Sequence, residues 1–176
     1  MHRNIKLSLK RMSKIKIQLT VLDWLIEILA LVLISVIWGI TIYSYSKLPD
    51  VIPLHYAVSG KPDVFGGKEN IFSLPMLAAI IFMGLTIVNR YPQIFNFPVK
   101  ITAENVLKRF KDATRLIRYM KLVVIAAFTY YIIKTTKYAG DINAITQGLG
   151  VRFLLLVIGI LFIPLMYFSI KTFRSK

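Results

Sequence analysis

Residues 21–43 read VLDWLIEILALVLISVIWGITIY, an apolar run with only two charged side chains, Asp23 and Glu27. A helix needs about 20 mostly apolar residues to cross a bilayer, and the apolar region of a signal peptide is shorter, about 7–15 residues. We therefore expect this run to form a helix that stays in the membrane. Within it, Ser35 and Gly39 form a small-xxx-small pattern that permits close helix contact, either within the chain or between two copies.

Three further apolar blocks follow at about residues 71–88, 122–133 and 151–170. Hydrophobic residues make up 56% of the chain and charged residues only 18%, whereas soluble domains have about 25% charged residues. Residues 102–121 alternate apolar and basic side chains at helical spacing, which is typical of an amphipathic helix. The pattern predicts an all-α membrane protein with four transmembrane helices and a cytoplasmic amphipathic helix that runs straight into the third span.

The basic residues indicate an orientation for these spans. Of the 23 Lys and Arg residues, 17 fall in residues 1–20, in segment 89–121 and at the C-terminus, which four spans would place on one side. By the positive-inside rule that side is the cytoplasm. We expect a basic tail (1–20), a single membrane domain (21–176) and both termini on the cytoplasmic side of a cell membrane, in a bacterium the inner membrane.

The net charge of +15 could also indicate nucleic-acid binding. Because the basic residues flank apolar blocks, anionic lipid headgroups are the better-supported partner, and we expect no nucleic acid. The predicted contacts with headgroups on the cytoplasmic side are Lys108, Arg109, Lys111, Arg115 and Arg118.

The predicted outer loop, residues 47–70, is rich in proline and glycine. Apolar and other side chains alternate with period two over residues 51–58, which favours a short strand, and Pro53 confines such a strand to an edge. A turn at Ser59-Gly60 would fold the strand back as a small hairpin at the membrane surface.

Few residues outside the apolar blocks indicate a chemistry. His55 and Asp63 in the outer loop are weak candidates for a metal site, and a structural histidine is the alternative that we favour. Asp23 and Glu27 lie one helical turn apart, and we expect them to form salt bridges with the basic tail or the 102–121 helix. There is no cysteine and no recognisable enzyme motif, so we expect neither a cofactor nor an enzymatic activity.

The outer loop also carries a recognisable pattern: LPDVIPLHY at 48–56, GKPD at 60–63 and GGK at 66–68, followed by NRYP at 89–92 and FNFPV at 95–99. These motifs resemble a bacterial membrane-protein family catalogued as "domain of unknown function 1648". Ala57 departs from its pattern, where Asn often follows the histidine and aromatic residue. The resemblance implies that the loop forms a ligand or partner site with signature residues Pro49, Pro53, His55, Gly60, Pro62, Asp63, Gly66 and Lys68.

The same domain opens the sporulation-delaying toxin immunity protein, so the resemblance implies, by analogy, an immunity or signalling role. We therefore expect a non-enzymatic membrane protein whose outer loop binds a protein or peptide. Two alternatives stay open at this stage. One is a component of ion- or proton-coupled transport that uses Asp23, Glu27 or His55, and the other is a metal-dependent membrane enzyme.

Overall fold

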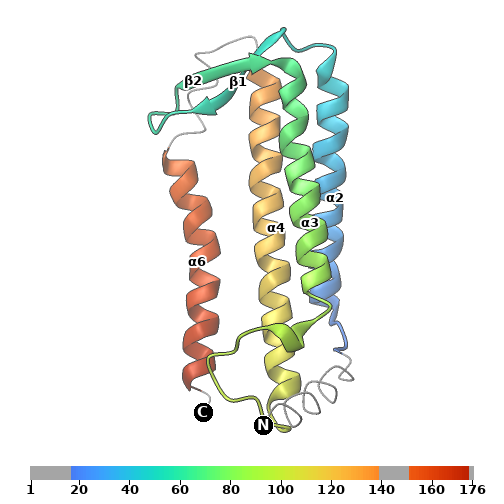
Figure 1. Ribbon diagram of the computed structural model, residues 1–176, viewed down its shortest axis with the longest axis vertical. Coiled ribbons are helices and arrows are strands. Elements are labelled where there is room, and N and C mark those ends of the chain that lie inside the picture. The colour runs from blue at the N-terminus through green and yellow to red at the C-terminus, as the bar shows by residue number, and fades with distance from the viewer. Residues whose placement is uncertain (1–16, 139–150, 175–176) are drawn as a thin grey trace.

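The computed structural model describes residues 17–138 and 151–174, which leaves most of the predicted basic tail outside the described residues. This part of the chain forms, in order, α2 (Val21–Tyr45), β1 (Val51–Tyr56), β2 (Pro62–Gly67), α3 (Ser73–Val88), α4 (Val106–Tyr138) and α6 (Val151–Arg174), besides two short 3₁₀ turns. In Figure 1, α2, α3 and α4 run side by side, and α6 runs along α4. The two strands cover one end of this bundle, which we call the hairpin end.

Helix α2 begins at a capping box. The Thr20 hydroxyl accepts a hydrogen bond from the Asp23 backbone N–H, and the Asp23 carboxylate accepts one of 2.8 Å from the Thr20 backbone N–H. Two N–H groups that no helical carbonyl can reach are thereby satisfied. The cap holds the start of the helix at Val21, where the apolar run begins.

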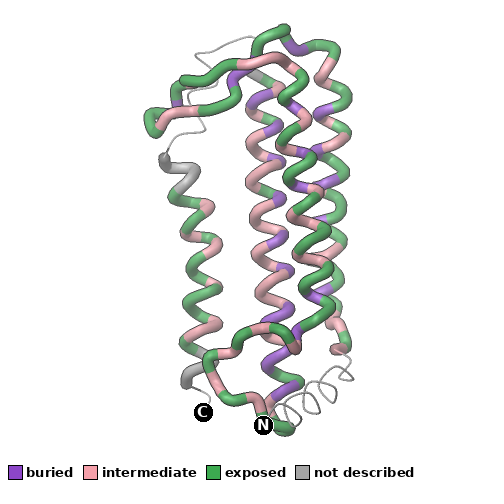
Figure 2. Tube along the Cα trace, in the orientation of Figure 1, coloured by how far each residue is buried: buried purple, intermediate pink, exposed green. Residues whose placement is uncertain are grey.

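The helices bury small and β-branched side chains against one another and expose large apolar ones. Figure 2 shows the buried positions on the inner sides of α2, α3 and α4, with exposed positions on their outer sides. Buried positions include Ala30, Ile34, Ile37, Ala78, Ile125 and Ile132. Exposed positions include Leu25, Ile28, Leu31, Ile80, Met83 and Ile87. Apolar surfaces of this extent are typical of helices surrounded by lipid rather than water.

Three helical segments are long and apolar enough to cross a membrane: Val21–Tyr45, Lys68–Val88 and Val106–Lys137, with mean hydropathies of 2.6, 2.4 and 1.6. In α6, the segment Leu155–Ile170 is apolar but shorter. The fold is therefore mostly helical with three candidate spans among the described residues. A fourth span through α6, and the cytoplasmic side of the termini, stay predictions.

The predicted amphipathic segment and the third apolar block form one continuous helix, as expected. Helix α4 runs through both, starting at Val106 rather than residue 102 and ending at Tyr138, beyond the predicted end at residue 133. Its first turns pack on protein, because Val106, Phe110 and Ala113 are buried and the ring of Phe97 stacks on that of Phe110 with centroids 5.7 Å apart.

The small-xxx-small pattern in α2 does not mediate packing within the described part of the chain. Ser35 is exposed, and its hydroxyl donates to the carbonyl of Leu31 in the same helix. A Cβ built on Gly39 would meet nothing within 4 Å. The pattern was predicted to permit close contact either within the chain or between two copies. The structure excludes the first use for the described helices.

The predicted hairpin is present. Strands β1 and β2 pair antiparallel from Val51 opposite Gly67 to Tyr56 opposite Pro62, with irregular register on both sides of His55. The turn contains Gly60 with φ of 84°, a left-handed conformation that glycine adopts without strain. Both strands of this sheet are edge strands, so Pro53 lies where the missing N–H is tolerated.

Candidate functional site

The inner side of the hairpin packs on the bundle. Leu48, Ile52 and Ile71 are buried and belong to the same apolar cluster as Ile37 and Ile132 of the helices. Burying an aliphatic side chain of this size contributes about 1.5–3 kcal/mol relative to leaving it in water. The hairpin is therefore held against the helix ends.

An ion pair closes the base of the hairpin. Lys68 Nζ lies 2.9 Å from Asp50 Oδ1, and the Lys68 backbone N–H donates to the Asp50 carbonyl at 2.9 Å. The neighbouring ammonium holds the pKa of the Asp50 carboxyl below its ordinary value. Lys68, a predicted partner-binding residue, thus has a structural contact that joins the two ends of the hairpin.

Several other signature residues also lie at structurally demanding positions. A Cβ on Gly66 would come within 2.5 Å of Leu54 Cδ1, so the Leu54 side chain would have to move to admit a larger residue there. Pro53 is buried, Pro62 is half-buried and Pro49 is exposed. Together with Gly60 in the turn, these residues shape the hairpin.

His55 and Asp63 are the signature residues that form an exposed polar pair. His55 Nδ1 lies 2.6 Å from Asp63 Oδ1, and their side chains are 65% and 44% exposed. Because Asp63 engages Nδ1, the other ring nitrogen, Nε2, is the one available to a partner. No group of three or more potential metal-ligating His, Cys, Asp or Glu side chains occurs in the described residues. The two side chains are the only members of the predicted weak metal site.

Tyr56 joins the hairpin to α4. Its ring meets that of Tyr131 edge-on, with centroids 5.7 Å apart. Burial raises the pKa of the Tyr56 phenol. The hydroxyl of Tyr56 is buried and makes no hydrogen bond of good geometry in the described part of the chain, nor does that of Thr135 in α4. A small cavity of about 50 Å³ lies nearby, between Pro53, Asn70 and Thr135.

A second polar cluster lies between α2 and α4, away from the hairpin end. We call it the ionic network, and its members are Asp23, Glu27, Arg115, Arg118 and Lys121. Arg115 donates to Asp23 through Nε at 2.8 Å and Nη2 at 3.1 Å, and Nη2 also donates to the Thr20 hydroxyl. The predicted salt bridges of Asp23 and Glu27 to the 102–121 helix are therefore confirmed.

Glu27 joins the remaining members of the ionic network. Lys121 Nζ lies 2.6 Å from Glu27 Oε2 and donates at 2.9 Å to the hydroxyl of Thr86 in α3. Arg118 Nε lies 3.2 Å from Glu27 Oε1, an ion pair without hydrogen-bond geometry. Lys121 is fully buried, and its ammonium also lies 4.6 Å from the centre of the Phe82 ring. The ionic network thus connects α2, α3 and α4.

Lipid contact was predicted for two residues that the structure buries. Arg118 is a member of the ionic network, and Arg109 is 3% exposed, so protein rather than headgroups surrounds both side chains. The prediction is wrong for Arg118 because its side chain faces Glu27 of α2. It is wrong for Arg109 because that side chain is also buried, although nine residues place it on the opposite side of α4 from Arg118. Arg115 is one-third exposed while paired with Asp23. Lys108 is exposed and Lys111 half-buried, so their lipid contact stays a prediction.

The sequence reasoning missed Lys121 and Thr86 as members of a polar site. Lys121 was counted only as one basic residue of the segment 89–121. A signal was present in the spacing. Lys121 lies three residues after Arg118 and four before Ile125, so on a helix it shares one face with a cation and with an apolar side chain that the structure buries. Thr86 carries no such signal, because a lone threonine in an apolar run is common.

The fold, with three apolar helices long enough to span a bilayer, defines a membrane protein. Residues 30–79 match the family described as "Domain of unknown function (DUF1648)", which confirms the resemblance seen in the loop motifs. The match covers the second half of α2, the hairpin and the start of α3.

One relative is an uncharacterised protein of Archaeoglobus fulgidus, which is 35% identical over 78 residues. These residues are 40% of this chain and 43% of the relative, so the chain covers less than half of that protein. Because the relative is archaeal, similarity to this chain is not confined to bacteria. No solved structure matches the chain.

Proposed function

We propose that the chain is a non-enzymatic membrane protein that recognises a protein or peptide partner through its hairpin, in an immunity or signalling role. One observation carries the proposal. The hairpin packs on the bundle through the buried Ile52, while it presents the exposed His55–Asp63 pair. A rigid element with exposed polar groups loses little conformational entropy when a partner binds.

The exposed surface has the chemistry of a peptide-binding surface. We call it the hairpin surface: His55, Val58, Asp63 and Phe65, all exposed. Protein interfaces combine apolar and aromatic side chains with a few directional polar groups. His55 Nε2 provides a hydrogen-bonding group, and Phe65 provides apolar contact area.

Complementation of a gene deletion tests the proposal. We expect Phe65→Ser, or His55→Ala combined with Asp63→Ala, to lose the rescue that the wild-type gene provides, at equal protein level in the membrane. Lys61→Gln is the matched control, because Lys61 is exposed in the same hairpin but lies outside the hairpin surface. Full rescue of every deletion phenotype by the hairpin-surface variants would refute recognition by the hairpin.

A second candidate function, ion- or proton-coupled transport, is favoured by the ionic network. Ionisable residues within candidate spans are expensive to bury and often mark ion pathways. Glu27 and Lys121 are the members to test, since Lys121 is fully buried and pairs with Glu27. Purified protein in vesicles should then support an ion or proton flux that Glu27→Gln reduces. A flux equal to that of empty vesicles, for every ion tested, would reject this candidate.

A further inference from the structure

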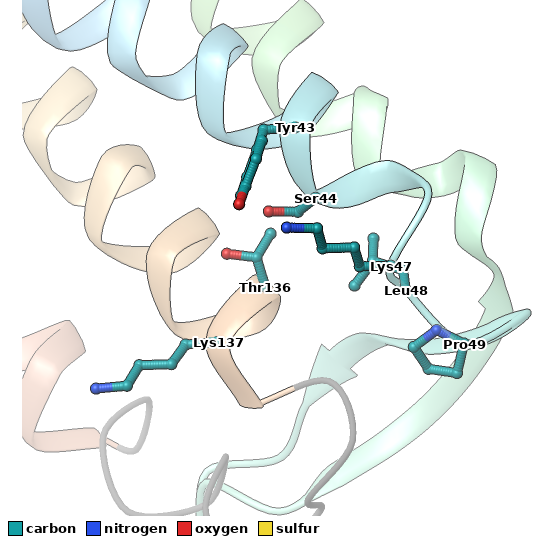
Figure 3. A pocket seen from close by; sticks show the side chains of 7 residues that line it. All are labelled: Tyr43, Ser44, Lys47, Leu48, Pro49, Thr136 and Lys137. Carbon is teal, nitrogen blue, oxygen red and sulfur yellow. The ribbon is translucent and has the colours of Figure 1, made fainter.

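A cavity of about 640 Å³ opens at the hairpin end, between the last turns of α2 and α4. We call it the hairpin-end cavity. Its lining consists of Tyr43, Ser44, Lys47, Leu48, Pro49, Thr136 and Lys137, which Figure 3 shows as sticks. The volume lies in the range of about 300–1,000 Å³ that is typical of ligand sites. Most ligand sites are apolar, whereas five of these seven side chains carry an ammonium or hydroxyl group.

The lining is positively charged. Among the described residues, it contains two lysines and no carboxylate. Lys47 Nζ lies 3.6 Å from the centre of the Tyr43 ring, which holds the ammonium at the cavity. Within residues 17–138 and 151–174, no carboxylate forms an ion pair with Lys47, because the nearby Asp50 is engaged by Lys68. The positive charge of Lys47 is therefore not neutralised by a described side chain.

Three hydroxyl-bearing side chains also line the cavity. In Figure 3 Tyr43, Ser44 and Thr136 lie on the same side as Lys47 Nζ, while Lys137 points away from them. The Thr136 hydroxyl donates to the Ile132 carbonyl at 2.8 Å, so the N–H groups of Lys47 and the hydroxyls of Tyr43 and Ser44 are the donors left for a ligand.

The ends of two helices also meet at this cavity, and helix C-termini carry partial negative charge. In α2 the effect is reduced, because the Ser44 carbonyl already accepts from the backbone N–H groups of Lys47 and Leu48, at 2.9 and 3.1 Å. The full positive charge of Lys47 exceeds the roughly half charge of a helix end. The balance favours an anion.

The depth of the cavity selects the class of anion. Tyr43 and Thr136 lie at the hairpin ends of the candidate spans Val21–Tyr45 and Val106–Lys137. The ends of spans lie at the level of lipid headgroups, where the anionic group common to phospholipids is phosphate. Ammonium and hydroxyl donors suit phosphate oxygens, which accept several hydrogen bonds.

We propose that the hairpin-end cavity binds a phosphate group, with Lys47 as the principal cation and the hydroxyls of Tyr43 and Ser44 as further donors. The phosphate belongs either to a phospholipid headgroup or to a soluble phosphate. This site is separate from the hairpin surface, so it stands or fails independently of partner recognition.

Binding to the purified full-length protein in a neutral detergent tests the proposal. The probes are dihexanoyl phosphatidylglycerol and inorganic phosphate, and binding is measured by titration calorimetry. Lys47→Gln is expected to weaken binding at least about tenfold, the effect of losing a charged hydrogen-bond donor. Lys137→Gln is expected to weaken it less, and Lys61→Gln, a control on another exposed lysine, should have no effect.

Binding of the lipid alone would identify a headgroup site, and binding of both probes with similar affinity would identify a site for soluble phosphate. Both results support the proposal if Lys47→Gln weakens the binding while the unfolding transition of the variant matches that of the wild type. The proposal is overturned if neither probe binds, or if Lys47→Gln binds them as the wild type does.

Discussion

Replacing Asp23 by alanine is expected to destabilise the bundle. The Asp23 side chain is 1% exposed and accepts hydrogen bonds from Arg115 Nε, Arg115 Nη2 and both the backbone and hydroxyl of Thr20. Its loss removes the capping box of α2 and leaves an arginine without its carboxylate.

The expected magnitude follows from these contacts. Breaking a buried ion pair by removing one partner costs about 3–5 kcal/mol, and losing a helix N-cap costs about 0.5–2 kcal/mol. Arg115 is one-third exposed and can regain some water, which reduces the first term. We therefore expect Asp23→Ala to lower the free energy of unfolding by about 3 kcal/mol.

A double-mutant cycle shows whether the lost free energy of unfolding comes from the Asp23–Arg115 ion pair. In Asp23→Ala with Arg115→Ala, no unpaired guanidinium remains, so the double variant should be less destabilised than the sum of the two single variants by about 1–3 kcal/mol. The assay is reversible unfolding in mixed micelles with increasing dodecyl sulfate, followed by far-ultraviolet circular dichroism. A loss under about 1 kcal/mol for Asp23→Ala, or strict additivity in the cycle, would refute the reasoning.

Three further predictions concern the hairpin. Gly60→Ala should lower the free energy of unfolding by about 1 kcal/mol in the same assay, because φ at this position is 84°. The control is Gly39→Ala in α2, where a Cβ meets nothing within 4 Å, and it should leave the free energy of unfolding unchanged or raise it. Tyr56→Phe should leave stability unchanged or raise it slightly, because the deleted hydroxyl is buried without a hydrogen bond of good geometry, and a loss above about 1 kcal/mol would contradict this. Lys68 lowers the pKa of the Asp50 carboxyl below its ordinary value of 3.8. At a pH above 3.8 the ion pair should therefore stabilise the hairpin fully, and this stability should be lost as the pH falls through the lowered pKa. Carboxyl carbon shifts in a pH titration measure this, and Lys68→Gln should return the pKa of Asp50 toward its ordinary value.

The hairpin shows how far local sequence can go. Period-two alternation, Pro53 and the Ser59-Gly60 turn were enough to predict two edge strands, because turn chemistry and strand periodicity act over a few residues. The same information could not distinguish the structural role of Lys68 from a binding role. That distinction depends on Asp50, which lies 18 residues earlier and meets Lys68 only when the strands pair.

The prediction of headgroup contacts failed for a related reason. Charge counts treat the basic residues of segment 89–121 as one group, yet α4 turns Arg118 and Lys121 toward Glu27 and leaves Lys108 exposed. A helix places residues three and four apart on one face, so the face could be read from the sequence. Which of these faces meets α2 could not be read from the sequence.

By itself, the sequence determined that this is a membrane protein with long apolar helices and a small hairpin, because apolar length and turn residues act locally. Only the tertiary structure decided which cations neutralise Asp23 and Glu27, since the partners are more than 90 residues away and their meeting depends on the register of α2 against α4. The same register brings Lys47 and Thr136 to one cavity at the hairpin end. Helix packing depends on the summed contacts of many side chains, which no local pattern contains.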